Sequence, residues 1–304
     1  MLDAGTYQAA NRPLNESERV DNLGILCATI PLRQRGLMTQ TLSGYFDASK
    51  AISDSPAIRK ALTEATKKAA NKRLRRYLKK TRRTCTEFVH EERGSQRWLA
   101  CRDLSPELAD RLRKSPDAFF ENQPLLKDGN TCTVVRLVHA GKAFVLKRYN
   151  AKRLGYRLRH AYSTPRALRS WSHGHALRAF GIATPRPMAC SRIYHGRLLK
   201  RAYLFMEEVE GVSLHELPQP ERMANAYASL SEELRLLQAT HGDMKASNFI
   251  VTADGTLTLI DRDSVCFHQT VPSFRRQAAK DRQRFLKNWR QRPEVLAAFQ
   301  EGRA

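Results

Sequence analysis

The sequence lacks the features that mark several classes of protein. It has no apolar run of roughly 18 residues, and its first residues, Met1-Leu2-Asp3-Ala4-Gly5, do not resemble a signal peptide. Its six cysteines are scattered, without a Cys-x-x-Cys pair or the cysteine and histidine spacing of a zinc site. These absences exclude a membrane span, a disulfide framework and a zinc module. We therefore expect a cytoplasmic chain in a reducing environment, with any membrane contact peripheral.

Acidic residues are also scarce. The 304 residues include 53 Lys and Arg against 30 Asp and Glu, a net charge of +23. Residues 129–206 contain sixteen Lys and Arg but no acid. An excess of this size predicts an anionic partner: nucleic acid, an acidic membrane face or a phosphorylated substrate. Because no recognised nucleic-acid-binding motif occurs, nucleic acid is not the partner that we expect.

A second stretch without acids, residues 67–83, contains ten Lys and Arg. Within it, Leu74, Tyr77 and Leu78 share one helical face. Two compatible interpretations follow. The stretch is a basic amphipathic helix that lies on an anionic leaflet, or it is a solvated helix that packs on the rest of the protein through its apolar face.

Hydrophobic periodicity and turn residues predict a mixture of helices and strands. The pattern is largely helical from Glu16 to Phe46, with a break at Pro31, and a long helix begins at Ser55-Pro56 and ends before Thr84. The remaining predictions are, in order, a hairpin (86–90 and 96–101), a helix broken at Pro116 (104–120), three strands (125–128, 131–138 and 143–149), a helix (164–180), a strand (202–206), a helix (220–240) and a final basic helix (274–289).

The strongest chemical pattern lies in residues 241–263. Asp243, Lys245 and Asn248 precede an apolar strand, and the Asp254-Gly255 turn predicts a hairpin that brings Asp261 back to the same end. Two carboxylates, an amide and an ammonium that converge on one point suit a magnesium–phosphate site, because Mg²⁺ prefers hard oxygen ligands. A carboxylate beside such a site can accept the proton of an attacking hydroxyl.

His241-Gly242-Asp243 through Asn248 resembles the catalytic loop of the protein-kinase superfamily, and the glycine after the histidine is similar to its small-molecule branch. The resemblance implies an α+β, bilobal protein-kinase-like fold with a small C-lobe, which uses ATP and Mg²⁺. It implies that Asp243 accepts or orients the hydroxyl proton and that Lys245 neutralises the transferring phosphoryl group. Asn248 and Asp261 would bind the metal.

Upstream segments resemble the nucleotide-binding half of the same superfamily. Phe144-Val145-Leu146-Lys147 looks like the strand whose lysine contacts the α- and β-phosphates. Residues 128–133 take the place of the glycine-rich loop, and Ala202 to Leu214 looks like the strand and hinge that border adenine. By this resemblance the nucleotide-binding residues are Lys147, Gly129, Asn130, Thr131, Met206, Glu207 and Val209.

One departure from the superfamily concerns the helix predicted at 164–180. The superfamily places a glutamate there to pair with the strand lysine, and this helix contains no acid. The spacing allows Ser170, His173 or His175 to face the lysine, although packing is the simpler expectation for the two histidines. Asp263 supports the metal site from behind or is a surface acid, and both interpretations stay open.

Three strings are similar to the bacterial lipopolysaccharide kinase family, which phosphorylates heptose or 3-deoxy-D-manno-octulosonic acid of the inner core: residues 144–149, 171–187 and 241–248. The resemblance extends over residues 84–290. It implies an ATP-dependent kinase for a sugar hydroxyl of lipopolysaccharide, an anionic glycolipid, with peripheral contact at the cytoplasmic face of the inner membrane. The short segment after Asp263, residues 264–304, argues against a polypeptide substrate.

The resemblance divides the chain into a basic helical region (1–83), an N-lobe (84–210) and a C-lobe (211–304). Arg19-Val20-Asp21-Asn22-Leu23 is similar to Asp281-Arg282-Gln283-Arg284-Phe285-Leu286. We therefore interpret the first region as a remnant of the C-lobe of a tandem kinase.

Two alternatives remain on the same fold. One is a kinase for Ser, Thr or Tyr of proteins, and the other is a pseudokinase-type module that binds a membrane or nucleic acid without catalysis. The missing acid in the 164–180 helix favours the second alternative, whereas the intact set Asp243, Lys245, Asn248 and Asp261 disfavours it. The sequence does not determine the oligomeric state.

Overall fold

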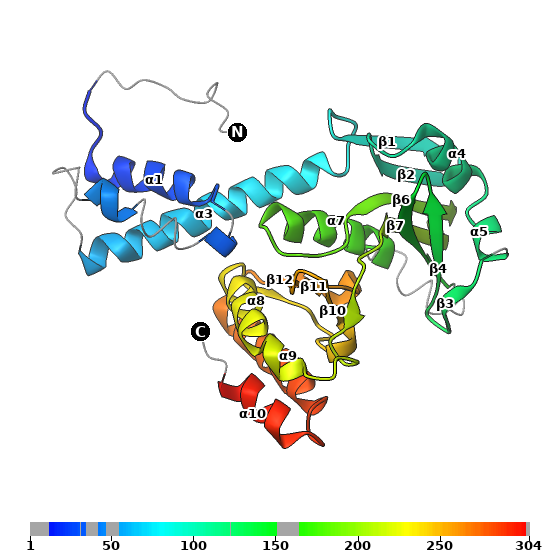
Figure 1. Ribbon diagram of the computed structural model, residues 1–304. Coiled ribbons are helices and arrows are strands. Elements are labelled where there is room, and N and C mark those ends of the chain that lie inside the picture. The colour runs from blue at the N-terminus through cyan, green and yellow to red at the C-terminus, as the bar shows by residue number, and fades with distance from the viewer. Residues whose placement is uncertain are drawn as a thin grey trace. The chain divides into compact units, whose positions relative to one another are not determined.

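The computed structural model describes residues 12–30, 32–34, 42–46, 55–121, 123–150 and 164–301, and the chain divides into two units, residues 1–75 and 76–304 (Figure 1). Helix α3 (Pro56–Lys80) passes from the first unit into the second. The predicted break at Pro31 lies outside the described residues, as do residues 151–163 of the acid-free span.

The first unit contains α1 (Glu16–Cys27), the short turn η2 (Leu32–Gln34) and most of α3. Helix α1 begins with a capping box, in which the Asn15 side chain accepts from the Glu18 amide and the Glu18 carboxylate accepts from the Asn15 amide, both at 2.9 Å. A small apolar core joins Val20 and Leu23 of α1 to Leu62 of α3. The described part of the first unit is therefore helical, as predicted.

The second unit contains a seven-stranded sheet in the order β1-β2-β6-β7-β5-β4-β3, and every neighbouring pair is antiparallel. The sheet confirms the predicted hairpin and the three predicted strands that follow it, whereas β6 was not predicted. Its strands are β1 (Phe88–Arg93), β2 (Gln96–Cys101), β3 (Leu125–Gly129), β4 (Cys132–His139), β5 (Lys142–Tyr149), β6 (Pro187–His195) and β7 (Leu198–Glu207).

Helices α4 (Pro106–Lys114), α5 (Ala118–Glu121) and α7 (Arg166–Ala179) share an apolar core with this sheet. The predicted break at Pro116 is confirmed, since α4 ends at Lys114 and α5 begins at Ala118. Ser105 caps α4 by accepting from the Leu108 amide at 3.1 Å. The fully buried Trp171 of α7 donates from Nε1 to the carbonyl of Thr81 at 2.9 Å. This bond ties the segment that follows α3 to α7.

The rest of the second unit is mostly helical and has a core of its own. Around that core the ring of Phe285 stacks on Tyr227 at a centroid distance of 3.8 Å. Helix α10 was not predicted, and the predicted 220–240 helix ends earlier, before Gln238 takes a positive φ of 49°. The helices are η3 (Pro220–Met223), α8 (Ala224–Leu236), η4 (Ala246–Asn248), η5 (Arg262–Ser264), α9 (Val271–Lys287) and α10 (Pro293–Glu301), with short strands β8 (Val212–Ser213), β9 (Ala239–Thr240) and β12 (Cys266–Phe267).

The predicted hairpin is present as β10 (Phe249–Val251) and β11 (Leu257–Leu259), which pair with Phe249 opposite Leu259. Gly255 in its turn has a φ of 77°, which glycine adopts without strain. Just outside the paired residues, the Ile260 amide donates to the Asn248 carbonyl at 2.9 Å. The hairpin therefore returns Asp261 to the end at which Asn248 lies.

The exposure of residues 67–83 bears on both interpretations of this basic stretch. All ten Lys and Arg of residues 67–83 are exposed, whereas Leu74 is buried and Tyr77 and Leu78 are partly buried. The Tyr77 ring packs on the sheet core and meets the Phe88 ring edge-on at 6.2 Å. The apolar face of the stretch thus packs inside the protein. Over the described part of the chain, no helix combines the length and apolar character that a membrane crossing requires.

The architecture is mixed α+β, with one large antiparallel sheet and helices, as the sequence predicts. Figure 1 shows the sheet in blue-green and green, and the helices α8, α9 and α10 in yellow to red around the β10–β11 hairpin.

Candidate active site

A buried acid of α9, Asp281, holds the backbone of the loop that carries Asp243. The Asp281 carboxylate, 3% exposed, accepts from the His241 amide at 2.8 Å and from the Gly242 amide at 3.0 Å. The His241 ring is fully buried, and its Nε2 lies 2.9 Å from the Ile260 carbonyl. Gly242 adopts a φ of 78°, and a Cβ there would lie 2.6 Å from the Ser264 carbonyl oxygen. These contacts fix the backbone from which Asp243 projects.

The Asp243 carboxylate lies between two cations. Its Oδ2 accepts from Lys245 Nζ at 3.1 Å, and its Oδ1 accepts from Arg284 Nη1 of α9 at 2.5 Å. Burial opposes the charged form, but the Lys245 ammonium and the Arg284 guanidinium outweigh it, so that the pKa of Asp243 is lowered. Asp243 is therefore ionised at neutral pH and able to accept a proton.

Asn248 and Asp261 are the candidate metal ligands. The amide nitrogen of Asn248 donates to the Asp243 carbonyl at 2.7 Å, so the amide oxygen is the atom with which Asn248 would ligate a metal. Asp261 adopts the left-handed conformation, with a φ of 55°. Among the residues that the structure describes, no group of three or more His, Cys, Asp or Glu could hold a metal ion. One carboxylate and one amide oxygen suit Mg²⁺, which takes its remaining ligands from water and phosphates.

Lys147 lies at the same place, as the sequence predicts. Its Nζ donates to Oδ1 of Asp261 at 2.7 Å and to Oδ2 of Asp263 at 2.9 Å, and its side chain is 8% exposed. Burial opposes the ammonium charge, and the two carboxylates outweigh that effect, so that the pKa of Lys147 is raised. The strand lysine and the candidate metal ligand are thus brought together from β5 and from the end of β11.

Asp263 is not a surface acid, so that interpretation is wrong. Its side chain is 4% exposed, because η5 turns it into the protein, toward β5 and α7. The Tyr149 hydroxyl donates to its Oδ1 at 2.7 Å, and Arg166 Nη2 donates to its Oδ2 at 2.8 Å. The phenol stays protonated, because burial and the Asp263 charge raise the pKa of Tyr149 well above its ordinary value.

The loop that is predicted to take the place of the glycine-rich loop is the tight turn between β3 and β4. Gly129 ends β3, and Asn130 and Thr131 form the connection to β4. Asn150 holds this turn, since its side-chain Nδ2 donates to the Gly129 carbonyl at 2.7 Å and its backbone N–H donates to the Thr131 carbonyl at 3.2 Å. The turn is thus fastened to the end of β5, the strand of Lys147.

The residues that are predicted to border adenine lie at the end of β7 and just beyond it. Met206 is opposite Val145 of β5, and its sulfur lies 3.6 Å from Arg262 Nη2. The Glu207 amide already donates to the Arg186 carbonyl at 3.0 Å, so its backbone carbonyl is the group that could still bind adenine. Val209 lies two residues beyond the strand.

The two histidines of α7 do not contact Lys147. The His175 ring lies edge-on to Trp171 at 4.4 Å and to Phe88 at 4.9 Å, and the His173 ring lies edge-on to Phe267 at 5.7 Å. Burial lowers the pKa of His175 to about 3 and that of His173 to about 4. Both are therefore neutral packing residues. Ser170, the third residue considered for this position, is buried.

Four residues of the site were missed or only partly recognised from the sequence: Asp281, Arg284, Arg166 and Tyr149. Asp281 and Arg284 lie in the basic helix that the sequence predicts, and a lone acid in a helix so rich in cations is a signal that could have identified Asp281. Arg262, which lies between Asp261 and Asp263, is 1% exposed and donates to Thr184 Oγ1 and the Pro185 carbonyl, both at 2.7 Å.

Several cations of the acid-free span, residues 129–206, form ion pairs, although the span itself contains no acid. Acids from other segments pair with several of its cations: Arg136 with Glu208, Lys147 with Asp261 and Asp263, Arg148 and Arg201 with Asp117, Arg166 with Asp263, and Arg186 with Asp103. The fold therefore neutralises part of this positive charge with acids that lie outside the span.

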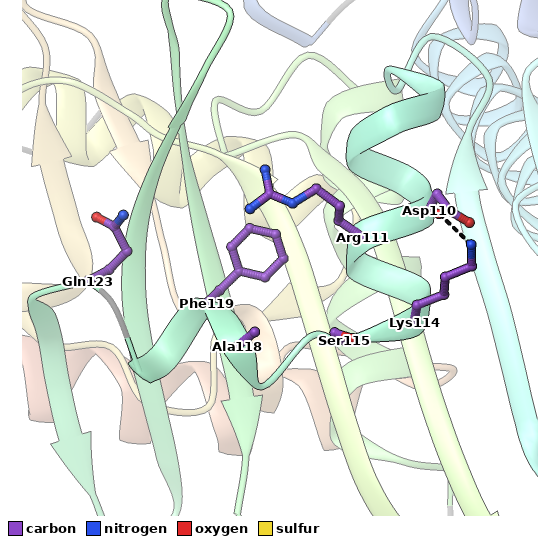
Figure 2. A pocket seen from close by; sticks show the side chains of 7 residues that line it. All are labelled: Asp110, Arg111, Lys114, Ser115, Ala118, Phe119 and Gln123. Carbon is purple, nitrogen blue, oxygen red and sulfur yellow. Dashed lines mark ion pairs between the residues drawn. The ribbon is translucent and has the colours of Figure 1, made fainter.

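A cavity of about 380 Å³ lies away from these residues, between α4 and α5 (Figure 2). Figure 2 shows the Arg111 side chain reaching toward Phe119, whose ring it covers at 5.0 Å from the centroid. None of the predicted nucleotide residues lines this cavity, so it is separate from the predicted nucleotide site. It is lined by Asp110, Arg111, Lys114, Ser115, Ala118, Phe119 and Gln123.

Comparison with known families identifies one match. The model of the lipopolysaccharide kinase (Kdo/WaaP) family matches residues 125–296, which is more than half of the chain. The matched segment extends from β3 to α10 and includes all of the predicted site residues. No protein of curated function matches the chain significantly.

Proposed function

Because the chain belongs to the lipopolysaccharide kinase (Kdo/WaaP) family, whose members phosphorylate heptose or Kdo of the inner core, we propose a specific reaction for its site. The γ-phosphoryl group of ATP passes, with Mg²⁺, to a sugar hydroxyl of the lipopolysaccharide inner core at the cytoplasmic face of the inner membrane. The observation that carries this proposal is the position of Asp243. It is ionised, anchored through Asp281, and one hydrogen bond away from the metal candidate Asn248.

The proposed fold is bilobal and protein-kinase-like. The sheet with α4, α5 and α7 forms the N-lobe, and α8, α9, α10 and the β10–β11 hairpin form a small C-lobe. Two separate apolar cores support this division. The boundaries at 84–210 and 211–304, and the origin of residues 1–83 in a second kinase C-lobe, belong to the same proposal.

In the proposed reaction Asp243 accepts the proton of the sugar hydroxyl as the oxygen attacks the γ-phosphorus, and the bond from that phosphorus to the bridging oxygen of ATP breaks. Lys245, 3.1 Å from Asp243, neutralises the phosphoryl group in transit. Lys147 holds the nucleotide phosphates, and the turn at 129–131 covers them. Positioning and charge stabilisation then supply most of the rate acceleration, since phosphoryl transfer needs little covalent chemistry from the protein.

Asn248 and Asp261 would hold Mg²⁺ through one amide oxygen and one carboxylate. When bound, Mg²⁺ neutralises negative charge on the nucleotide phosphates. Met206, Glu207 and Val209 border the adenine in this proposal, with the Glu207 carbonyl as the hydrogen-bonding group, because its amide is bound to Arg186.

The acceptor and the role of Asp243 are tested together. Purified protein, ATP, Mg²⁺ and isolated inner-core oligosaccharide are incubated, and the product is weighed by mass spectrometry. We expect the wild type to add one phosphate and Asp243→Asn to be slower by about 10²-fold or more, because the carboxylate is lost as proton acceptor. Asp110→Asn is the matched control, since Asp110 is a surface acid of α4. Undiminished activity of Asp243→Asn contradicts the proposal.

The same assay tests the protein-kinase alternative, and a thermal-shift measurement tests the non-catalytic one. Phosphate on added protein instead of the core sugar favours a protein kinase. An absence of any thermal shift with Mg-ATP favours the non-catalytic module, because a ligand that binds the native state raises its melting temperature by mass action.

We propose that membrane contact uses charge rather than insertion. The ten Lys and Arg of residues 67–83 are exposed, whereas the apolar face between them is covered by the protein. The expected result is binding to vesicles that contain anionic lipid, with a loss as salt rises, because exposed charges are screened. Equal binding to neutral vesicles contradicts this contact.

A further inference from the structure

Lys147 is a cation in an unusual position. Its side chain is 8% exposed, and an ammonium taken out of water costs several kcal/mol unless anions compensate it. Helix α7 is packed against the sheet of Lys147, but it contains no Asp or Glu. The compensating charge must therefore come from another element.

That charge comes from two acids that differ in exposure. The Asp261 side chain is 35% exposed, and the Asp263 side chain is 4% exposed. Both lie within 3 Å of Lys147 Nζ, at 2.7 Å and 2.9 Å respectively. Because an exposed carboxylate can exchange its partner for a solvated ion and a buried one cannot without a desolvation penalty, only Asp261 is suited to leave Lys147 for a metal.

Asp263 is held in place from other directions. Tyr149 lies two residues after Lys147 on β5 and donates its hydroxyl to Asp263 Oδ1 at 2.7 Å. Arg166, the first residue of α7, donates to Asp263 Oδ2 at 2.8 Å. One carboxylate thus joins β5, η5 and the start of α7, and its orientation does not depend on Lys147 alone.

The two acids and the two cations, Lys147 and Arg166, also balance in formal charge. A lysine ammonium has three donors, and two of them are used by Asp261 and Asp263. If Asp261 turns to a metal, Asp263 still fixes the ammonium, and two donors face the nucleotide phosphates.

We propose that Asp263 is the positioning residue of Lys147, and that it replaces from η5 the acid that α7 lacks. This inference rests on the proposed nucleotide site but not on the identity of the acceptor. It assigns Arg166 and Tyr149 as the residues that hold Asp263. It also differs from the expectation that Asp263 supports the metal, because the groups that contact its carboxylate are Lys147, Tyr149 and Arg166.

The test is a double-mutant cycle on nucleotide binding, measured by calorimetry with ATP, in the presence and absence of Mg²⁺. Asp263→Asn keeps the shape of the side chain and an acceptor for Tyr149 but removes the charge. We expect it and Lys147→Met each to weaken ATP binding about tenfold or more, and the double variant to be no weaker than the worse single variant, because partners in one interaction are not additive.

The metal-support role predicts a different result. There, Asp263→Asn would weaken binding only when Mg²⁺ is present, and its effect would add to that of Lys147→Met. Either finding overturns the proposal, as does unchanged binding by Asp263→Asn. If the wild type binds ATP but phosphorylates no core sugar, the proposed function fails and the inference about Asp263 stands. If the wild type binds no ATP, both fail.

Two further variants separate positioning from folding. Tyr149→Phe removes one hydrogen bond to Asp263 and leaves the ion pair, so we expect a smaller loss of ATP affinity in the same direction, about two- to fivefold. Asp103→Asn removes an acid from the exposed ion pair with Arg186 and is expected to bind ATP like the wild type. If Asp263→Asn does not fold, an unchanged affinity of Tyr149→Phe is sufficient to overturn the proposal.

Discussion

Asp281 is expected to stabilise the protein by holding the loop that carries Asp243. Asp281→Ala removes a carboxylate that is 3% exposed and that accepts from the His241 amide at 2.8 Å and the Gly242 amide at 3.0 Å. A buried donor left without its partner costs about 1–3 kcal/mol, so the two amides together cost about 2–6 kcal/mol. A domain has only about 5–15 kcal/mol of stability in total, so the loss is a large fraction of it.

The assay is urea unfolding at neutral pH. We expect the midpoint of Asp281→Ala to fall with little change of slope, and Asp281→Asn, which keeps one acceptor oxygen, to lose less. Asp110→Ala, a surface substitution on α4, should unfold at the same urea concentration as the wild type. If the midpoint of Asp281→Ala is also unchanged, the carboxylate does not anchor the loop and the reasoning is refuted.

Two other substitutions test the fold around the site. Gly242→Ala should lower both stability and activity well below Gly255→Ala: both glycines have a φ near 77–78°, but only at Gly242 does a Cβ meet a neighbour, the Ser264 oxygen at 2.6 Å, so equal unfolding midpoints would exclude the clash. His175→Gln should reduce the loss of folding stability at acid pH. Burial lowers the pKa of His175 to about 3, below its ordinary 6.5, so the neutral ring contributes its full stability above pH 6.5. Below that pH the unfolded chain takes up a proton at this position, and the free energy of unfolding falls by about 1.4 kcal/mol per pH unit. Urea midpoints at pH 7, 6, 5 and 4 measure this slope, and an unchanged slope in the variant would contradict the assignment.

Short-range patterns predicted much of the site. The Asp254-Gly255 turn and the apolar runs beside it determined the β10–β11 register, and this register returns Asp261 to Asn248. The strand that contains Lys147 was likewise predicted from residues within the strand itself. Such features depend on residues within one hairpin or strand, where periodicity and turn chemistry act directly.

The long-range contacts could not be obtained in the same way. The pair of Lys147 and Asp263 joins residues 116 positions apart, and Asp281 reaches His241 across 40 positions. Nothing in the neighbourhood of Asp263 distinguishes a surface acid from a buried one, because its burial depends on how η5 meets β5 and α7. The exposure of the basic stretch around Leu74 likewise depends on what covers the apolar face.

Strand β6 was missed for a related reason. Its side chains are buried continuously rather than alternately over Pro187 to Arg192, which means that both faces of the strand are covered. A strand covered on both faces loses the period of two by which an edge or half-exposed strand is recognised.

We propose that this chain places phosphate on a sugar of the lipopolysaccharide inner core. Mass spectrometry tests this on core oligosaccharide from the parent strain, from a strain that lacks the gene, and from that strain complemented with wild-type or Asp243→Asn protein. We expect one phosphate to be lost on deletion, restored by the wild type and not restored by Asp243→Asn. A core with the same phosphate content in all four strains would contradict it.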